Sequence, residues 1–217
     1  MVSLGNPQNN YPCIHVAGSK GKGSVSAFCA TALETEGYKV GLYTSPHLRD
    51  FEERMRINWR SIPQGKFIEY INLLKPHVAK IPRLNTFEIA TALAFLYFSD
   101  EKVDIAVIEV GLGGRLDATN VIVPKVSVIT ALYLEHTAIL GDTLLQIAKE
   151  KSGIIKPGVP VVVSPQREEA QLVVSSIAAR RQSHLTQVGI DYIYEPIESS
   201  LEHQNFRIQS LNSGKQT

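Results

Sequence analysis

The sequence predicts a three-layer α/β domain of the P-loop type, with a mostly parallel sheet between layers of helices. Three observations predict this fold. Short apolar runs rich in β-branched residues alternate with longer segments of helical periodicity. The runs are almost continuous in apolar side chains, as in parallel strands that are buried on both faces. Glycines and polar residues follow several of these runs directly, at the sheet edge where such folds bind their ligands.

Five strands are expected from the apolar runs. They cover residues 13–17, 40–44, 105–110, 126–130 and 159–163. Helical segments separate several of these runs, and this alternation favours parallel strands joined by helices that cover the sheet.

A helix is expected after the first strand, because apolar residues recur there at helical spacing. Gly37 follows as a stop signal. The apolar face of this helix consists of Val25, Phe28, Cys29, Ala32 and Leu33. Further along the chain, residues 87–98 are apolar almost all round. This second pattern predicts a helix packed between layers.

Two more helices are expected in the second half of the chain. Asp142 and Thr143 form a good cap before a helix that begins at Leu144 and is closed by Gly153. A last helix is expected over residues 167–181. We expect residues 1–189 to form one ligand-binding domain, and residues 190–217 to be a weakly patterned C-terminal segment.

The composition is ordinary for a soluble globular protein. The 217 residues are 44% hydrophobic and 20% charged, which is too apolar for disorder. A net charge of +1 gives no reason to expect nucleic acid or a membrane as a partner. The first residues lack the pattern of a signal peptide, and the longest apolar stretch is too short to span a membrane. We therefore expect a cytoplasmic monomer, with Cys13 and Cys29 as reduced, buried thiols.

A glycine-rich loop follows the first strand and precedes a helix. It consists of Gly18, Ser19, Lys20, Gly21, Lys22, Gly23 and Ser24. Glycines let the backbone fold around an anion, amides at a helix start point toward phosphate, and a lysine neutralises its charge. The strict P-loop pattern is not met, because Val16 and Gly23 stand where it needs a glycine and a hydroxyl residue. A flexible lysine-rich turn is the alternative, and the flanking strand and helix favour the phosphate loop.

Chemically active side chains follow three more strands. Ser45 comes after the second strand, Glu109 closes the third and His136 follows the fourth. A Ser-Pro pair is often only a turn and a lone histidine is often a core residue, but a buried carboxylate must be paired or bound to metal. Oxygen ligands with one histidine suit magnesium or manganese better than zinc. The residues thus indicate an enzyme that uses a magnesium nucleotide, and they leave its acceptor open.

The sequence resembles the folylpolyglutamate synthase and dihydrofolate synthase family, within the Mur ligase group, over residues 4–189. The resemblance rests on the glycine-rich loop, on residues 44–48, 51–58, 140–141 and 147–154, and above all on the stretch 109–120. Three positions depart from the family pattern: Lys20 replaces an Asn, Asn85 a Thr and Glu135 an Asp. The change at Asn85 puts the selectivity for the pterin in question.

The resemblance implies the fold of the central domain of Mur ligases and a set of site residues. Magnesium would bind to Ser45, Glu109 and His136, and to Lys151 as a carbamate. Residues 19–22 would bind ATP with their flanking glycines and Ser24, and Lys22, His136 and Lys151 would be catalytic. Arg115 and Asp117 would orient the pterin and the loop. The pterin positions would be Asn85, Thr86, Phe87, Glu88, Leu116, Asp117 and Ala118.

The resemblance also implies a reaction. ATP would phosphorylate the carboxylate of folate or dihydropteroate, and the amine of L-glutamate would attack the acyl phosphate, with Mg²⁺ as cofactor. Family members are longer, and their glutamate-binding C-terminal domain has no counterpart here, so we expect the isolated chain to be inactive. Two alternatives remain: a non-catalytic nucleotide-binding fragment, and a Mur-type ligase for another acceptor, which the stretch 111–120 disfavours.

Overall fold

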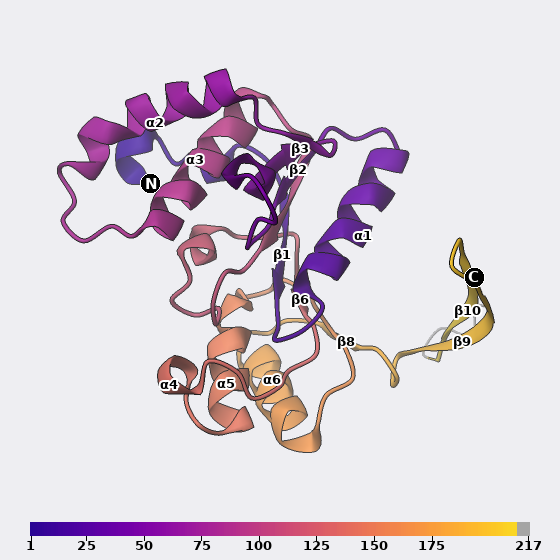
Figure 1. Cartoon of the computed structure of the whole chain (residues 1–217). Coiled ribbons are helices and arrows are strands. Elements are labelled where there is room, and N and C mark those ends of the chain that lie inside the picture. Colours follow the sequence, from indigo (N-terminus) through magenta and orange to yellow (C-terminus); the bar gives the residue numbers. More distant parts are fainter. Residues whose placement is uncertain (212–217) are drawn as a thin grey trace.

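The computed structural model describes residues 1–211, which form an eight-stranded sheet with helices on both faces and a separate two-stranded hairpin (Figure 1). The order of strands in the large sheet is β4-β3-β2-β5-β1-β6-β7-β8. Their bounds are β1 Cys13–Ala17, β2 Val40–Tyr43, β3 Met55–Ile57, β4 Arg60–Ser61, β5 Ile105–Glu109, β6 Val126–Ile129, β7 Val161–Val163 and β8 Leu185–Gln187. All neighbours are parallel except β2 with β3 and β3 with β4, which are antiparallel. The predicted mostly parallel sheet is confirmed.

The bounds of the helices are α1 Lys22–Thr35, α2 Gln64–Val78, α3 Thr86–Asp100, α4 Thr137–Leu140, α5 Leu144–Lys151 and α6 Glu168–Arg180. The four predicted helices are present as α1, α3, α5 and α6, whereas α2 and α4 were not predicted. Short 3-10 helices cover η1 Val2–Leu4, η2 Pro7–Asn9, η3 Phe51–Arg54, η4 Ala118–Val121 and η5 Ser152–Ile154. None of the described helices is long and apolar enough to cross a membrane. The Thr143 side chain caps α5 by accepting from the amide of Gln146, as expected from its position.

The two faces of the sheet can be followed from β1, because successive residues of a strand point to opposite faces. Cys13 belongs to a core cluster with α2 and α3, and Ala17 to a second cluster with α5 and α6. Val16 points the other way and packs against Ala30 of α1. The three layers are therefore α2, α3, α5 and α6 on one face, the sheet, and α1 on the other.

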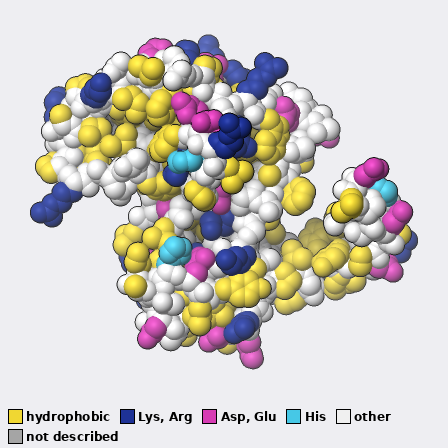
Figure 2. Space-filling view, viewed as in Figure 1, with side chains coloured by type: hydrophobic (Ala, Val, Ile, Leu, Met, Phe, Trp, Pro, Cys, Tyr) yellow, Lys and Arg dark blue, Asp and Glu magenta, His cyan; other side chains and the backbone are white. Residues whose placement is uncertain are grey.

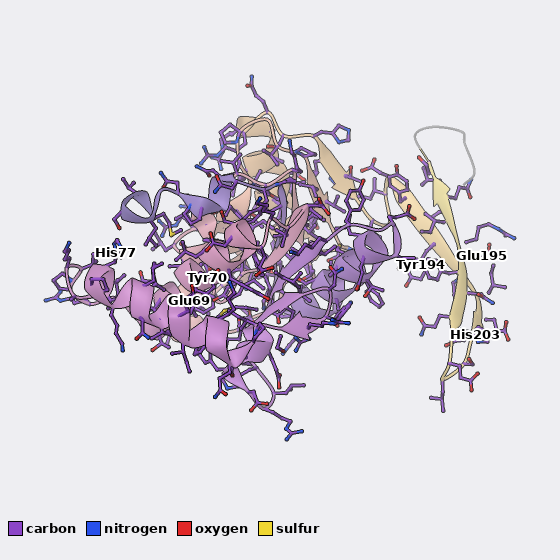
Figure 3. All side chains as sticks on the ribbon, turned by 90° about the horizontal axis from the view of Figure 1, so that it is seen from above. Glu69, Tyr70, His77, Tyr194, Glu195 and His203 are labelled. Carbon is purple, nitrogen blue, oxygen red and sulfur yellow. The ribbon has the colours of Figure 1, made fainter. Side chains whose placement is uncertain are left out.

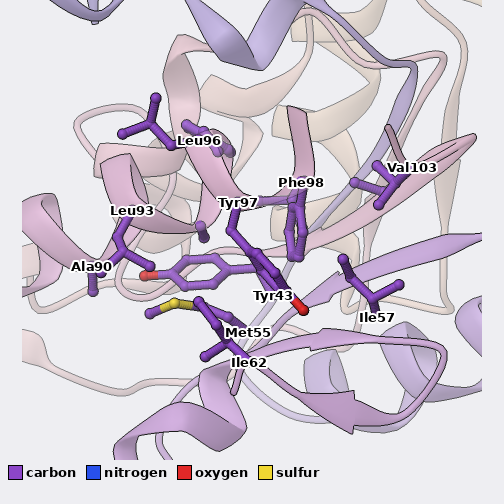
Figure 4. Close-up of a cluster of buried hydrophobic side chains, with 14 of the residues drawn as sticks. Tyr43, Met55, Ile57, Ile62, Ala90, Leu93, Leu96, Tyr97, Phe98 and Val103 are labelled. Carbon is purple, nitrogen blue, oxygen red and sulfur yellow. The ribbon is translucent and has the colours of Figure 1, made fainter. Parts of the chain in front are cut away.

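The helix α3 is the centre of the largest core cluster. Leu93, Phe95 and Phe98 of this helix are completely buried, which confirms the prediction from its all-round apolar pattern. Phe98 lies over Gly41 of β2, where a Cβ atom would come within 3.0 Å of the ring. Figure 4 shows Phe98 beside Tyr43 and other members of the cluster. This packing fixes the position of β2, whose end carries the predicted residue Ser45.

The predicted apolar face of α1 is wrong in part. Phe28 is 76% exposed and Ala32 is also exposed, whereas Ser26 and Ala30 are buried. Only a narrow stripe of small residues on α1 packs against the sheet, and their small size lets the helix approach closely. Phe28 lies outside that stripe. Gly37 follows the helix with a positive φ of 89°, as its role as a stop requires.

The C-terminal segment forms a hairpin that the sequence pattern does not reveal. Its strands are β9 Tyr192–Ser199 and β10 Gln204–Ser210, and every residue of β9 is exposed. A strand exposed on both faces shows no alternation of apolar and polar residues, so it leaves no signal. The hairpin lies on the opposite side of the molecule from Glu69 and His77 of α2 (Figure 3). Between it and the open face of β7 and β8 lies an apolar hollow of about 1230 Å³.

Candidate nucleotide and substrate site

The candidate site lies where β2, β5, β1 and β6 end at the same edge of the sheet. The loops that follow these strands carry the glycine-rich segment, Ser45, the stretch after Glu109, and His136. On the face shown in Figure 2, basic, acidic and histidine side chains gather in the narrow middle part of the view, between the upper and lower parts of the molecule. Polar loops at the carboxyl ends of parallel strands form the binding crevice of this class of fold.

The first half of the glycine-rich loop is fastened to the segment after β6. The amides of Ser19 and Lys20 both donate to the carbonyl oxygen of Ala131, at 2.9 and 3.2 Å. The Ser19 hydroxyl donates to the Tyr133 carbonyl at 3.0 Å and accepts from the Tyr133 amide at 3.0 Å. A Cβ atom on Gly18 would stand 1.8 Å from the Thr130 hydroxyl oxygen, so only glycine fits there.

The second half of the loop offers free amides. Gly21 adopts a left-handed conformation with φ 85° and starts α1 without any side-chain cap. The amides of Lys22, Gly23 and Ser24 therefore lie at an uncapped helix start, where a helix has no internal acceptors for them. This geometry and the helix dipole form an anion site. We expected residues 18–24 to bind the nucleotide, and within this set residues 21–24 have the geometry of an anion site.

Lys151 is buried beneath the loop. Only 1% of it is exposed, and its Nζ donates to the Gly18 carbonyl at 2.9 Å and to Glu135 Oε1 at 2.7 Å. Lys22 Nζ donates to the same Gly18 oxygen at 3.0 Å, so two ammonium groups meet at one atom. Burial lowers the pKa of Lys151, although the hydrogen bond and charge of Glu135 oppose it. Lys151 therefore does not face solvent.

Glu109 and Ser45 are in direct contact. Glu109 is 4% exposed, and its Oε2 accepts from the Ser45 amide at 3.2 Å. Its carboxylate also faces Gly23 at the start of α1, where a Cβ atom would lie 3.7 Å away. Burial raises the pKa of Glu109, against the lowering effects of the Ser45 amide and the Lys22 charge. No basic side chain among residues 1–211 forms a salt bridge with Glu109.

His136 lies in the loop after β6, with φ 47°, and begins α4. It lines the same hollow as Ser45. In the described part of the chain, no three His, Cys, Asp or Glu side chains gather into a metal cluster. The predicted set contains only two residues of those types, Glu109 and His136, so it is a sparse ligand set.

A hollow of about 800 Å³ joins the predicted nucleotide and pterin residues. Lys22, Ser45 and His136 line it, together with six of the seven predicted pterin positions, all except Thr86. A smaller hollow of about 380 Å³ shares Ser45 with it and is lined by Gly21, Gly23, Ser24 and Glu109. Gly18, Ser19, Lys20 and Lys151 line neither hollow and lie behind the loop. The structure thus brings most of the predicted residues around two adjoining spaces.

Several pterin positions also hold the backbone in place. Asn85 and Glu88 form a reciprocal cap of α3, in which each side chain accepts from the amide of the other residue, at 2.9 and 2.8 Å. Phe87 lies under the loop after β5: a Cβ atom on Gly111 would come within 2.4 Å of its ring. Asn85 and Glu88 therefore have a structural role whether or not they touch a ligand.

The loop after β5 is held by two acidic side chains. Asp117 accepts from the amide of Leu112 at 2.9 Å and from the amide and hydroxyl of Thr119 at 2.9 and 2.5 Å. Arg115, which we expected to orient the pterin and the loop, forms a two-pronged pair with Glu150 of α5 at 2.9 and 3.0 Å. Arg115 therefore ties the loop to α5.

Sequence reasoning missed Arg54, which also lines the larger hollow. Its Nε donates to His47 Nδ1 at 3.0 Å, and its guanidinium lies 4.9 Å from the centre of the Phe51 ring. Among the described residues it forms no salt bridge with a carboxylate. Arg54 lies in a short 3-10 helix, where a single arginine has no pattern that would distinguish it from a surface charge.

Comparison with known proteins shows the family to which this chain belongs. The family model for the Mur ligase middle domain matches residues 16–216. The dihydrofolate synthase/folylpolyglutamate synthase of Bacillus subtilis is 43% identical over 186 residues, which cover 83% of this chain and 43% of that protein. The chain belongs to the folylpolyglutamate synthase and dihydrofolate synthase family of Mur ligases.

Other members of the folylpolyglutamate synthase family give the same result. The folylpolyglutamate synthase of Lacticaseibacillus casei is 41% identical over 196 residues, 88% of this chain and 46% of that protein. A solved FPGS–AMPPCP complex superposes with a TM-score of 0.91 at 39% identity, over 97% of this chain and 54% of that one. An FPGS–AMPPCP–folate complex has a TM-score of 0.90 at 39% identity and covers 97% and 53%. The chain spans about half the length of these relatives.

Proposed function

We propose that this chain is the nucleotide-binding part of an ATP-dependent ligase that joins L-glutamate to the carboxylate of folate or dihydropteroate. One observation carries the proposal: Lys22, at the uncapped start of α1, opens onto the same hollow as six predicted pterin positions. The names of the relatives and the solved complexes with AMPPCP and folate support it.

The start of α1 would bind the phosphates. The amides of residues 22–24 offer hydrogen bonds and Lys22 offers a positive charge, which are the contributions that phosphoryl transfer requires from a protein. The acceptor carboxylate attacks the γ-phosphate and ADP leaves. The amine of glutamate then attacks the acyl phosphate and releases phosphate. The protein contributes mainly positioning, charge neutralisation and exclusion of water.

Ser45, Glu109 and His136 would hold Mg²⁺. The fit is supported by Glu109, a buried carboxylate that forms no salt bridge among residues 1–211 and that a cation would satisfy. Magnesium usually keeps several waters and phosphate oxygens, so a sparse set of protein ligands suits it. When bound, the ion would supply charge neutralisation at the phosphates. Titration of AMPPCP with and without Mg²⁺ tests this assignment, which predicts much weaker binding without the ion.

Arg54 would bind the carboxylate of the acceptor. It is a cation on the wall of the larger hollow, oriented by His47 and Phe51 and without a carboxylate partner among residues 1–211. Because Nε is occupied by His47, the two terminal nitrogens remain for an anion, and guanidinium groups favour two-pronged contacts with carboxylates. Arg54→Lys should weaken folate binding without changing AMPPCP binding.

Lys151 would carry a carbamate in the active enzyme. A neutral amine would take up CO₂ and release a proton, and the lowered pKa of Lys151 favours the neutral amine. The ion pair with Glu135 opposes this step, so the pair must separate when the carbamate forms. Labelling with ¹³C bicarbonate and NMR would reveal a carbamate carbon in the wild type that is lost in Lys151→Met.

Assays on the isolated chain separate the ligase from the alternatives. Calorimetry should detect AMPPCP and folate, and phosphate release that depends on glutamate would show the complete ligase reaction. Release with dihydropteroate but not tetrahydrofolate, or the reverse, would identify the acceptor. Binding of AMPPCP without any pterin would favour a nucleotide-binding fragment or a Mur-type ligase for another acceptor.

We further infer that residues 1–189 form the ligand-binding unit, since both hollows of the site and all eight strands of the large sheet fall within them. A cytoplasmic, monomeric protein remains our proposal. Limited proteolysis should cut near the start of the hairpin, and light scattering should give the mass of one chain.

A further inference from the structure

The side chain of His15 is completely buried in the middle of β1, yet it is polar. The other residues of β1 on the same face, Cys13 and Ala17, lie in apolar clusters. His15 Nε2 lies 2.9 Å from the hydroxyl of Thr119, and its other ring nitrogen, Nδ1, has no partner. A buried nitrogen without a partner costs stability, so packing alone does not account for a histidine at this position.

The hydrogen bonds determine which nitrogen carries the proton. The Thr119 hydroxyl donates its one proton to Asp117 Oδ1 at 2.5 Å, because a carboxylate can only accept. The same hydroxyl must then accept from His15, which places the ring proton on Nε2. Burial lowers the pKa of His15 to about 3, with the Lys156 charge acting in the same direction. The ring therefore stays neutral, with the same tautomer, throughout the ordinary pH range.

A continuous chain of donors thus runs from the core to the wall of the hollow. His15 donates to Thr119, and Thr119 donates twice to Asp117, through its hydroxyl and its amide. The other oxygen of Asp117 accepts from the Leu112 amide at 2.9 Å, which closes the loop after β5. Leu112 and Asp117 both line the larger hollow. One face of the acceptor site is thereby connected to a side chain that itself contacts no ligand.

We propose that His15 is a positioning residue for the acceptor site: through Thr119 it holds the Asp117 carboxylate and the loop from Gly111 to Asp117 in the conformation that receives the pterin. The position of Asp117 as a pterin contact rests on the proposed function. The effect of His15 on the Asp117 carboxylate does not, because every link in it is a hydrogen bond within the chain.

Three variants separate positioning from simple structural support. His15→Leu removes the donor and also the unpaired nitrogen, so it should change the unfolding midpoint little. His15→Gln places an amide donor near the position of Nε2 and should restore function. Ser127→Ala is the matched control. Ser127 lies in β6 directly opposite His15, and its hydroxyl donates to the Ile154 carbonyl at 3.2 Å, so it takes no part in the hydrogen bonds that connect His15 with Asp117.

The first measurement is the affinity of each variant for folate and for AMPPCP with Mg²⁺. We expect His15→Leu to weaken folate binding about fivefold, in line with the loss of one hydrogen bond. AMPPCP affinity should stay unchanged, and His15→Gln and Ser127→Ala should bind both ligands normally. Thr119→Val should weaken folate binding to a similar extent, with no further loss when combined with His15→Leu. Unchanged folate affinity in His15→Leu, or equal losses for both ligands, would overturn the proposal.

The second measurement needs no ligand. Amide hydrogen exchange at Leu112 should be faster in His15→Leu than in the wild type and normal in His15→Gln, and ¹⁵N NMR should show a proton on Nε2 but not on Nδ1. If the wild-type chain binds no folate, the proposed function fails, and exchange at Leu112 still decides whether His15 holds the loop. Exchange that is unaffected by His15→Leu would overturn the inference with or without folate binding.

Discussion

Replacing Gly18 by alanine tests how the phosphate loop is built. An added Cβ would lie 1.8 Å from the Thr130 hydroxyl oxygen, 2.9 Å from Thr130 Cβ and 3.1 Å from the Thr130 amide nitrogen. Rotation of the hydroxyl would relieve only the first of these contacts. Thr130 is itself buried directly after β6, so it has little room to move away. The loop must shift instead, together with the start of α1.

Two costs combine in Gly18→Ala. Overpacking a buried position costs about 1–3 kcal/mol. The φ of Gly18 is 151°, which side chains rarely adopt, and such backbone strain costs about 1–3 kcal/mol. We expect a loss of roughly 2–6 kcal/mol in the free energy of unfolding, and a fall in Tm of roughly 2–4 °C for each kcal/mol lost in a domain of this size. AMPPCP affinity should fall as well, because residues 21–24 move with the loop.

Urea unfolding of a double-mutant set measures the clash itself. Thr130→Ala removes the hydroxyl oxygen, so Gly18→Ala should cost about 1–3 kcal/mol less in that background. Thr130→Ser keeps the oxygen and should give less relief than Thr130→Ala. The same cost of Gly18→Ala in all three backgrounds would refute the clash as its origin. A cost below about 0.5 kcal/mol would show that the loop tolerates a side chain there.

Three further predictions follow from the site and the core. Lys22→Ala should weaken AMPPCP binding by at least about tenfold with an unchanged Tm, because the ammonium group lies at the start of α1 outside the apolar core, and calorimetry measures the affinity. Glu109→Gln should raise the stability of the metal-free protein at neutral pH and weaken the Mg²⁺ dependence of AMPPCP binding. Burial raises the Glu109 pKa above its ordinary value of 4.5, so the ionised carboxylate opposes folding and the protonated carboxyl does not. The stability that Glu109→Gln gains over the wild type should therefore vanish as the pH falls below the ordinary carboxyl pKa. Urea midpoints measured across this pH range test the prediction. Thiol labelling should modify Cys29 well before Cys13, which is buried with its pKa raised to about 12.

A specific result would contradict each of these three predictions. Unchanged AMPPCP affinity in a folded Lys22→Ala protein would remove the anion site from α1. A Glu109→Gln protein that loses stability but keeps its Mg²⁺ dependence would make Glu109 a structural residue. Equal labelling of the two thiols would contradict the packing of β1.

The sequence predicts the elements that have long, nearly continuous apolar runs, and it misses the exposed hairpin as well as the shorter or more mixed β3 and α2. The helix at Phe95 is apolar almost all round, and the strand at Cys13 is apolar at every position except His15, so burial leaves its pattern directly in the residues. The hairpin around Tyr194 is exposed and has no pattern. Phe28 was misplaced because periodicity gives the spacing of apolar residues but not the width of the stripe that the sheet covers.

The candidate site divides in the same way. Ser45, Glu109 and His136 lie at or after the carboxyl ends of strands. Because the carboxyl ends of parallel strands meet at one edge of a sheet, the sequence alone places these residues together. The links that decide their chemistry join distant parts of the chain, such as Arg54 with His47 or Lys151 with Glu135. No spacing rule predicts such pairs. They become visible only when the fold brings the side chains together.

The carbonyl oxygen of Gly18 accepts from both Lys22 and Lys151. An oxygen with two lone pairs can satisfy both donors, but it needs only one of them to avoid being left without a partner. If the start of α1 binds a phosphate, as proposed, Lys22 can turn toward it while Lys151 keeps donating to the Gly18 oxygen. Lys22 can therefore give up its hydrogen bond to Gly18 and bind a ligand without leaving the Gly18 carbonyl oxygen unpaired. The hydrogen bond from Lys151 thus lowers the free-energy cost of moving the Lys22 side chain.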